Sequence, residues 1–221
     1  MSSYADKLGY ILIFPATTHN GGCWDVRSTA SITHGGGGDS LGITSMVRYA
    51  LTKYGGDPAR VFATGSSSGG MMTNVLLAAY PDLFAGGASF SGSPYGCWDG
   101  PTPNAIGGAS CPATGQKYTP QNWGDLVRKA YPGFAGKRPP LQVWHGTADT
   151  VVAYINMADQ LAEWSDVLGV SWTQNVTDSP QKGYTQMVYG DGTKLVGYSA
   201  VGVGHMVPFH EEQVLTFFGL L

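Results

Sequence analysis

Charged side chains are scarce in this sequence. Its 221 residues include 12 Lys and Arg and 15 Asp and Glu, or 12% in all, with a formal net charge of −3. Binding to nucleic acid or to an anionic membrane requires clustered basic residues, so we expect neither partner. No run of 18 apolar residues occurs, which excludes a predicted membrane-spanning helix. Residues 1–10 carry Asp6 and Lys7 and lack the apolar core of a signal peptide.

Cysteine is also rare, and Cys23, Cys97 and Cys111 make an odd count. No Cys-x-x-Cys pair and no His/Cys spacing indicates a metal site, so no metal is expected. Cys97 and Cys111 close a segment rich in Gly, Pro and Ser, which favours a disulfide in an oxidising compartment. Three reduced thiols are the alternative.

Glycine and aromatic residues are plentiful, with 33 Gly, 13 Pro, 6 Trp, 12 Tyr and 8 Phe. Many ordered loops are therefore expected, and the composition is typical of secreted proteins that act on carbohydrates. The length suits one α/β domain spanning residues 1–221. It is also sufficient to bury a large core.

Short apolar runs alternate with helical patterns along the chain. The pattern predicts strands over residues 9–14, 60–64, 88–92, 141–146, 185–189 and 195–200, and helices over 41–54, 71–80, 122–131, 154–168 and 210–220. This alternation indicates a largely parallel sheet covered by helices on both faces. Residues 16–38 are predicted to be a loop, followed by a helix capped by Asp39 or Ser40. The four glycines at 35–38 do not have the spacing of a phosphate-binding loop.

The segment Gly65-Ser66-Ser67-Ser68-Gly69-Gly70 lies between an expected buried strand and an expected helix. Strand, Gly-x-Ser-x-Gly and helix together indicate a nucleophile elbow, in which a strained turn lifts the Ser67 hydroxyl above the sheet. We expect Gly65 and Gly69 to provide room for the turn and Gly70 to let the helix pack closely. The backbone N–H of Ser68 is the expected first oxyanion donor. A Ser/Gly-rich turn without chemistry is the alternative.

A serine nucleophile needs a base, and the base needs a carboxylate that orients it. In the chain order Ser, Asp, His, the candidates are Ser67, Asp149 and His205. Asp149 follows a buried strand at the sheet edge where ligand chemistry collects in α/β proteins. His145 is the weaker candidate base, and a buried core histidine hydrogen-bonded to backbone is the favoured interpretation of it.

The remaining polar candidates have simpler interpretations. His19, His34 and His210 are expected to be solvated, and Asp191 is explained by its Gly-Asp-Gly turn. Asp25 is explained by a structural role. The exposed aromatic residues Trp24 and Trp98 are candidate substrate contacts.

Five segments together resemble a known family. Residues 22–26 (GCWDV), 36–40 (GGGDS), 61–75 (VFATGSSSGGMMTNV), 145–149 (HGTAD) and 202–208 (GVGHMVP) are similar to acetyl xylan and feruloyl esterases of carbohydrate esterase family 1, relatives of polyhydroxybutyrate depolymerases. The resemblance implies an α/β-hydrolase fold, secretion, no cofactor, and hydrolysis of esters on plant xylan. It assigns Ser67 as nucleophile, Asp149 as acid and His205 as base.

The sequence departs from that family at its N-terminus. Family members carry earlier strands and a loop that supplies a second oxyanion donor, so the resemblance implies a shortened sheet, a weakened esterase and self-association at an open strand edge. In the family's strand order, the absent strand would lie between residues 9–14 and 60–64. Deacetylation of xylan is the leading expectation, followed by feruloyl or polyhydroxybutyrate-type ester hydrolysis. A silent carbohydrate-binding protein is the alternative from another class.

Overall fold

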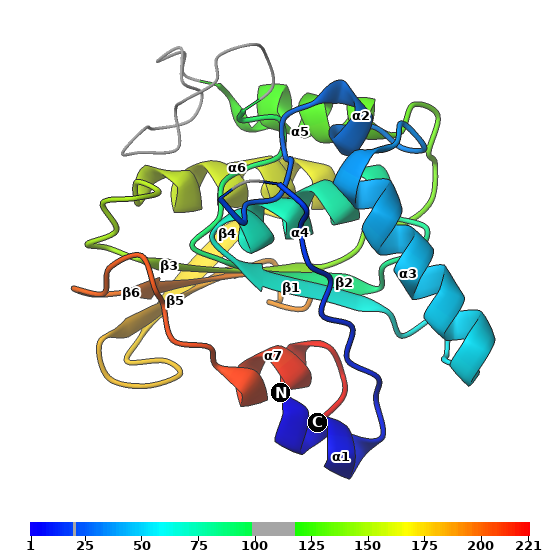
Figure 1. The fold of residues 1–221 in the computed structure, drawn as a ribbon. Coiled ribbons are helices and arrows are strands. Elements are labelled where there is room, and N and C mark those ends of the chain that lie inside the picture. Colours follow the sequence, from blue (N-terminus) through cyan, green and yellow to red (C-terminus); the bar gives the residue numbers. More distant parts are fainter. Residues whose placement is uncertain (20, 99–117) are drawn as a thin grey trace.

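A computed structural model describes residues 1–19, 21–98 and 118–221. A six-stranded sheet forms its centre (Figure 1). In chain order the strands are β1 (Phe62–Ser66), β2 (Gly86–Phe90), β3 (Leu141–Gly146), β4 (Trp172–Thr177), β5 (Tyr184–Tyr189) and β6 (Leu195–Ala200). In space they follow the order β1-β2-β3-β6-β5-β4.

The first half of the sheet is parallel and the second half is antiparallel. β1, β2, β3 and β6 run parallel, β5 pairs antiparallel with β6, and β4 pairs antiparallel with β5. Every residue of β2, β3 and β6 is buried, as expected for central strands covered on both faces. β4 is an edge strand whose six residues are all exposed. The sequence analysis missed β4 because it lacks the apolar pattern that a buried face produces.

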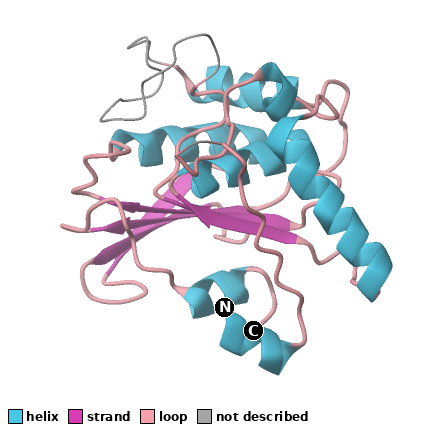
Figure 2. Ribbon diagram, in the orientation of Figure 1, coloured by secondary structure: helices cyan, strands magenta, loops and turns pink. Residues whose placement is uncertain are grey.

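Seven helices surround the sheet in the described part of the chain. They are α1 (Ser2–Leu8), α2 (Thr29–Ile32), α3 (Gly38–Tyr54), α4 (Ser68–Ala79), α5 (Pro120–Ala130), α6 (Ile155–Leu168) and α7 (Glu211–Phe217). Figure 2 shows most of them above the sheet, with α1 and α7 of Figure 1 below it. Helices thus cover both faces, and the α/β-hydrolase prediction for the fold is confirmed. No described helix has the length and hydropathy needed to cross a membrane.

Two hydrophobic clusters hold these layers together. The larger lies between the sheet and α4, α5 and α6, and includes the fully buried Leu77, Val143 and Trp164. The smaller lies between the sheet and α7, where Phe218 stacks on Phe62 at 4.4 Å. Because α4 contacts β1, β2 and the helices α2, α3 and α5, it is buried from Gly70 to Ala79. This explains why its sequence is apolar on all sides.

The predicted strand over residues 9–14 is wrong. The segment is irregular, and Ile11 and Phe14 are 50% and 78% exposed. β1 pairs on one side with β2, and no bond to residues 9–14 occurs on its other side in the described ranges. An apolar run becomes a strand only when a neighbour satisfies its backbone N–H and C=O groups, so the run alone was insufficient evidence.

The start of α3 also differs from the expected helix start. The helix begins at Gly38 rather than Leu41, and neither Asp39 nor Ser40 caps it. The Ser40 hydroxyl instead donates to the Ser31 carbonyl, and a carboxylate oxygen of Asp39 accepts from the Asp25 N–H at 2.7 Å. Gly38 has φ +63° and a Cβ there would lie 2.9 Å from Ser31, so this entry requires glycine. Part of the predicted 16–38 loop is the short helix α2.

Candidate active site

A sharp turn joins β1 to α4 at Ser67. β1 ends at Ser66, α4 begins at Ser68, and Ser67 between them has φ 57° and ψ −122°. Such a backbone is strained for a residue with a side chain, and it persists only where the surroundings enforce it. Here the Ser67 N–H donates to the Phe90 carbonyl at 2.9 Å, and its carbonyl accepts from the Met71 N–H at 3.0 Å. The turn therefore has the geometry of a nucleophile elbow.

Close backbone packing explains most of the glycines around this turn. A Cβ on Gly65 would lie 2.5 Å from the carbonyl carbon of Gly69, and one on Gly70 would lie 2.6 Å from the Phe90 oxygen. A Cβ on Gly69 would meet nothing nearer than the Trp24 indole nitrogen at 4.0 Å. The expected roles of Gly65 and Gly70 are confirmed. The backbone of Gly69 packs closely against Gly65, but a side chain on Gly69 itself would have space.

Two loops at the carboxyl ends of β3 and β6 bring Asp149 and His205 together. The Ala148 N–H donates to the Val203 carbonyl at 3.0 Å, and the Thr147 hydroxyl accepts from the Gly202 N–H at 2.8 Å. The two backbones approach so closely that a Cβ on Gly146 would lie 2.2 Å from the Val203 oxygen. Because β3 and β6 are neighbouring parallel strands, these loops leave the sheet at the same edge.

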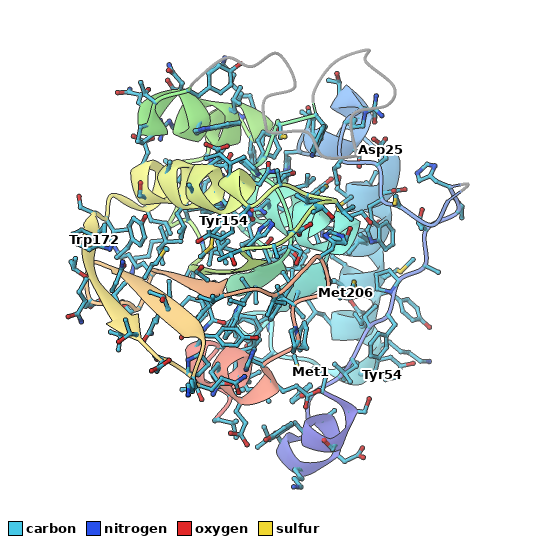
Figure 3. The ribbon with its side chains drawn as sticks, turned by 90° about the vertical axis from the view of Figure 1, so that its left-hand side faces the viewer. Met1, Asp25, Tyr54, Tyr154, Trp172 and Met206 are labelled. Carbon is cyan, nitrogen blue, oxygen red and sulfur yellow. The ribbon has the colours of Figure 1, made fainter. Side chains whose placement is uncertain are left out.

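The three predicted residues form one hydrogen-bonded chain. Ser67 Oγ lies 2.8 Å from His205 Nε2, and His205 Nδ1 lies 2.8 Å from Asp149 Oδ2. The other carboxylate oxygen, Oδ1, accepts from the N–H groups of Val151 and Val152 at 2.9 Å each. These distances lie within ordinary hydrogen-bond range and need no movement of the backbone. Met206, which follows His205, is 73% exposed at this edge (Figure 3).

The electrostatics of Asp149 suit a carboxylate that stays ionised. Burial of the side chain, 7% exposed as a residue, acts to raise its pKa. Hydrogen bonds from His205 and from the N–H groups of Val152 and Val151 outweigh burial, and the pKa falls below its ordinary value. Asp149 therefore remains an acceptor for His205 over the neutral pH range.

The expected oxyanion donor lies at the start of a helix. Ser68 is the first residue of α4, so its N–H has no carbonyl acceptor within the helix. The helix dipole adds positive potential at the same point. A negatively charged oxygen bound beside Ser67 would therefore accept a hydrogen bond from the Ser68 N–H and would be stabilised by the helix dipole.

The two candidate aromatic contacts differ in their surroundings. Trp98 was predicted to be exposed, but it is 8% exposed, and its indole N–H donates to the Ser93 hydroxyl at 2.7 Å. That expectation is wrong because the residue packs into the larger core cluster. Trp24 is partly buried against the same cluster, and its indole nitrogen faces the first turn of α4 near Gly69.

The other histidines are less solvated than predicted. His34 stacks on Tyr131 at 3.6 Å, and His210 stacks on Trp144 at 4.7 Å. Burial lowers the pKa of His210. His19 alone matches the expectation of an exposed side chain, and it contacts both oxygens of Asp39 at 3.1 Å.

His145 is buried and bonded to backbone, as predicted. Its Nε2 lies 2.9 Å from the Val152 carbonyl. The sequence analysis missed a second contact of that nitrogen, with Asp149 Oδ2 at 3.2 Å. The four-residue spacing of His145 and Asp149 after a strand is the signal that could have indicated this contact.

The cysteine predictions are tested only in part. Cys23 is a free, exposed cysteine, and Cys97 is buried. Cys111 lies outside the described residues, so the predicted Cys97–Cys111 disulfide stays a prediction.

The sheet order, the elbow and the loop-borne acid and histidine define an α/β hydrolase with the arrangement of a serine esterase. The chain belongs to the esterase PHB depolymerase family, whose model matches residues 1–186. Relatives include feruloyl esterase B of Neurospora crassa, 48% identical over all of this chain and 76% of that protein, and acetylxylan esterase A of Aspergillus ficuum, 39% identical over 99% and 73%. The solved acetyl xylan esterase of Aspergillus awamori matches with a TM-score of 0.92 at 36% identity, covering 100% of this chain and 81% of that one.

These relatives are carboxylic ester hydrolases by name, which places the chain in that enzyme class. The fraction of a relative's length that the chain covers differs among the relatives. It covers 61% of the feruloyl esterase B of Talaromyces stipitatus, which is 48% identical to it.

Proposed function

We propose that this chain is a serine esterase that removes acyl groups from xylan, with Ser67 as nucleophile, His205 as base and Asp149 as the orienting acid. The observation that carries the proposal is the hydrogen-bonded chain from Ser67 Oγ through both nitrogens of His205 to Asp149. It starts from a strained, partly exposed residue directly after the end of a strand. The names of the relatives support a xylan-derived ester as the substrate.

In this mechanism the Ser67 hydroxyl attacks the ester carbonyl while His205 Nε2 takes its proton. Asp149 accepts the Nδ1–H of His205, which fixes the tautomer and stabilises the imidazolium that forms. His205 then gives the proton to the departing alcohol oxygen of the sugar, leaving an acyl group on Ser67. A water molecule, deprotonated by the same histidine, releases the carboxylic acid and restores the serine.

The oxyanion of each tetrahedral intermediate would lie beside the start of α4. The Ser68 N–H donates to it there, and the helix dipole favours its negative charge. The Trp24 indole nitrogen lies near Gly69 in the first turn of α4, which makes Trp24 a candidate contact for the substrate. Trp98, whose indole N–H is already engaged by Ser93, is the weaker of the two candidate contacts.

The feruloyl group is the acyl group favoured by the comparisons. Four matched feruloyl esterase B proteins are each 48% identical to the chain, whereas four matched acetylxylan esterases are 39–43% identical and the solved acetyl xylan esterase is 36% identical. The exposed apolar side chain of Met206, next to His205, offers a surface for an aromatic acyl group. Acetyl is the second candidate, because the structural match at TM-score 0.92 is an acetyl xylan esterase. Plant xylan outside the cell is the corresponding partner, and secretion is part of the proposal.

Rates on methyl ferulate, p-nitrophenyl acetate and acetylated xylan, measured side by side, test the proposal. Ser67→Ala should lose several orders of magnitude in kcat on each active substrate, since the triad acts as a unit. Ser66→Ala is the matched control, because the Ser66 hydroxyl is buried and has no partner among the described residues. A Ser67→Ala protein with undiminished rates would refute the nucleophile. Binding of xylan without turnover of any ester would favour the carbohydrate-binding alternative.

A further inference from the structure

His145 lies near the end of β3, fully buried, and contacts the same oxygen of Asp149, Oδ2, that His205 contacts. Its Nε2 approaches two acceptors, the Val152 carbonyl at 2.9 Å and Asp149 Oδ2 at 3.2 Å. One N–H can be shared between two acceptors in a three-centre bond, with the shorter contact as the stronger part. A carbonyl oxygen can only accept, so the geometry requires a proton on Nε2.

The second ring nitrogen explains why His145 stays neutral. Nδ1 is buried and has no hydrogen-bond partner among the described residues. A proton on Nδ1 would therefore be a buried donor without an acceptor, which is costly. Burial lowers the pKa of His145, and the bond to Val152 and the charge of Asp149 only partly oppose this. His145 is thus a neutral imidazole with one N–H, unlike His205, which must change its charge during the reaction.

The four acceptor positions of Asp149 are all occupied. Oδ1 accepts from the N–H groups of Val151 and Val152, and Oδ2 is contacted by His205 Nδ1 and His145 Nε2. A carboxylate has about four lone-pair positions. The Val151 and Val152 donors belong to the backbone, and His145 is enclosed by protein. Of the two histidines only His205 is partly exposed, at 17% of its side chain.

The contacts among Val152, Asp149 and His145 form a closed ring. Val152 donates its N–H to one oxygen of Asp149, and its carbonyl receives the His145 proton that also faces the other oxygen. The titratable groups that face His145 are Asp149 and His205 from the loops after β3 and β6, and Tyr154 beside α6, whose ring is edge-on at 6.0 Å. The Tyr154 hydroxyl is engaged by Ser199 of β6 at 2.7 Å, which leaves Asp149 as the acidic neighbour of His145.

We infer that His145 is a positioning residue for the proposed esterase reaction, holding Asp149 in line with His205 and limiting how strongly that carboxylate retains a proton on His205. The inference rests on the proposed roles of Ser67, Asp149 and His205. Its N–H withdraws negative charge from the oxygen that His205 contacts. Without it, Asp149 would be a stronger partner for the imidazolium, so His205 would stay protonated to higher pH. The carboxylate would also lose one of its four fixed contacts.

His145→Phe and His145→Gln test this directly. Phenylalanine keeps a flat ring but has no donor, and we expect kcat to fall about tenfold with KM little changed, as for other outer contacts to a functional group. The midpoint of the pH profile of kcat/KM should move to higher pH. Glutamine places an N–H near the position of Nε2 and should restore both values toward the wild type. His145→Asn, whose amide reaches only the position of Nδ1, should resemble the phenylalanine variant.

His34→Phe is the matched control. His34 also bonds a backbone carbonyl, with Nδ1 2.6 Å from the Ala79 oxygen, and its half-buried ring stacks on Tyr131, but none of its contacts is with Asp149. Its loss should lower stability without moving the pH midpoint. If His145→Phe reduces activity only in proportion to the folded fraction, with the midpoint unchanged, His145 is merely structural and the inference is overturned.

The wild-type protein provides a test that does not depend on folding of a variant. Nitrogen NMR should find His145 as a neutral Nε2–H tautomer across the whole pH range of activity. An Nδ1–H tautomer, or titration of His145 within that range, would overturn the inference while leaving the proposed function intact. Loss of esterase activity in His145 variants together with full activity in Ser67→Ala would instead contradict the proposed function.

Discussion

Gly146 is the position where one added carbon atom should damage the site most selectively. It is the last residue of β3, and a Cβ built there would lie 2.2 Å from the Val203 oxygen and 2.5 Å from the Gly204 oxygen. Real Cβ contacts do not occur below 3.0 Å. In Gly146→Ala, the loop after β6 must therefore retreat by about 0.8 Å, and His205 is the next residue in that loop.

The expected magnitude follows from the hydrogen-bond geometry. Moving His205 by that amount would stretch its 2.8 Å contacts with Ser67 and Asp149 to roughly 3.6 Å, where no hydrogen bond remains. A misplacement of about 1 Å in a catalytic group costs about 10²-fold in rate. The overpacked loop should also destabilise the protein by about 1–3 kcal/mol.

Gly204→Ala provides the comparison, because a Cβ at Gly204 would meet nothing within 4 Å. Steady-state kinetics on the preferred ester and urea unfolding of both variants form the assay. We expect Gly146→Ala to lose about 10² in kcat and Gly204→Ala to stay near the wild-type rate. Full activity in Gly146→Ala, or an equal loss in both, would refute the argument that close contact of these loops positions His205.

Further predictions concern pH, the disulfide and association. Activity should rise with pH in one step, because a general base must be unprotonated to take the Ser67 proton, and a flat profile between about pH 5 and 8 would contradict a histidine base. Burial raises the pKa of Asp159 to about 6, so its contribution to stability is full below its ordinary value of 3.8 and is lost as pH rises through about 6. In Asp159→Asn, the free energy of unfolding measured in urea should depend less on pH between 3.8 and about 6. Peptide mass mapping of oxidised protein should find Cys97 joined to Cys111, worth about 3 kcal/mol by chain entropy; two free thiols would exclude the bond. The outer edge of β1 has no partner strand in the described ranges and Phe14 is 78% exposed, so sedimentation should show self-association that Phe14→Asp reduces.

The elements with strong local signals could be predicted from the sequence. β3 was predicted with its exact bounds, and α6 within one residue, because apolar periodicity and a terminal Gly169 mark them. The elbow was recognisable because its strained turn requires small residues on both sides of Ser67, and these residues are adjacent in the sequence.

The partners of Ser67 were nominated by chain order and by position after a strand. The sequence alone left His145 open as a competing base. The structure separates the two histidines by their surroundings, since His205 lies 2.8 Å from Ser67 whereas His145 is enclosed beside Asp149. Such a choice depends on contacts between residues far apart in the chain, which no local pattern encodes.

Residues 9–14 and β4 both show that local composition alone does not determine where a strand forms. Residues 9–14 have the apolar composition of a buried strand but pair with no strand in the described part of the chain, whereas β4 has an exposed, polar sequence and pairs with β5. Strand formation depends on whether another strand offers its N–H and C=O groups. The sequence by itself therefore determined the elbow and the approximate positions of the core strands and of α3 to α7, but not α1 or α2. Only the tertiary structure decided which edges are paired, which aromatic residues are buried, and which histidine reaches Ser67, because each of these depends on what the rest of the fold brings alongside.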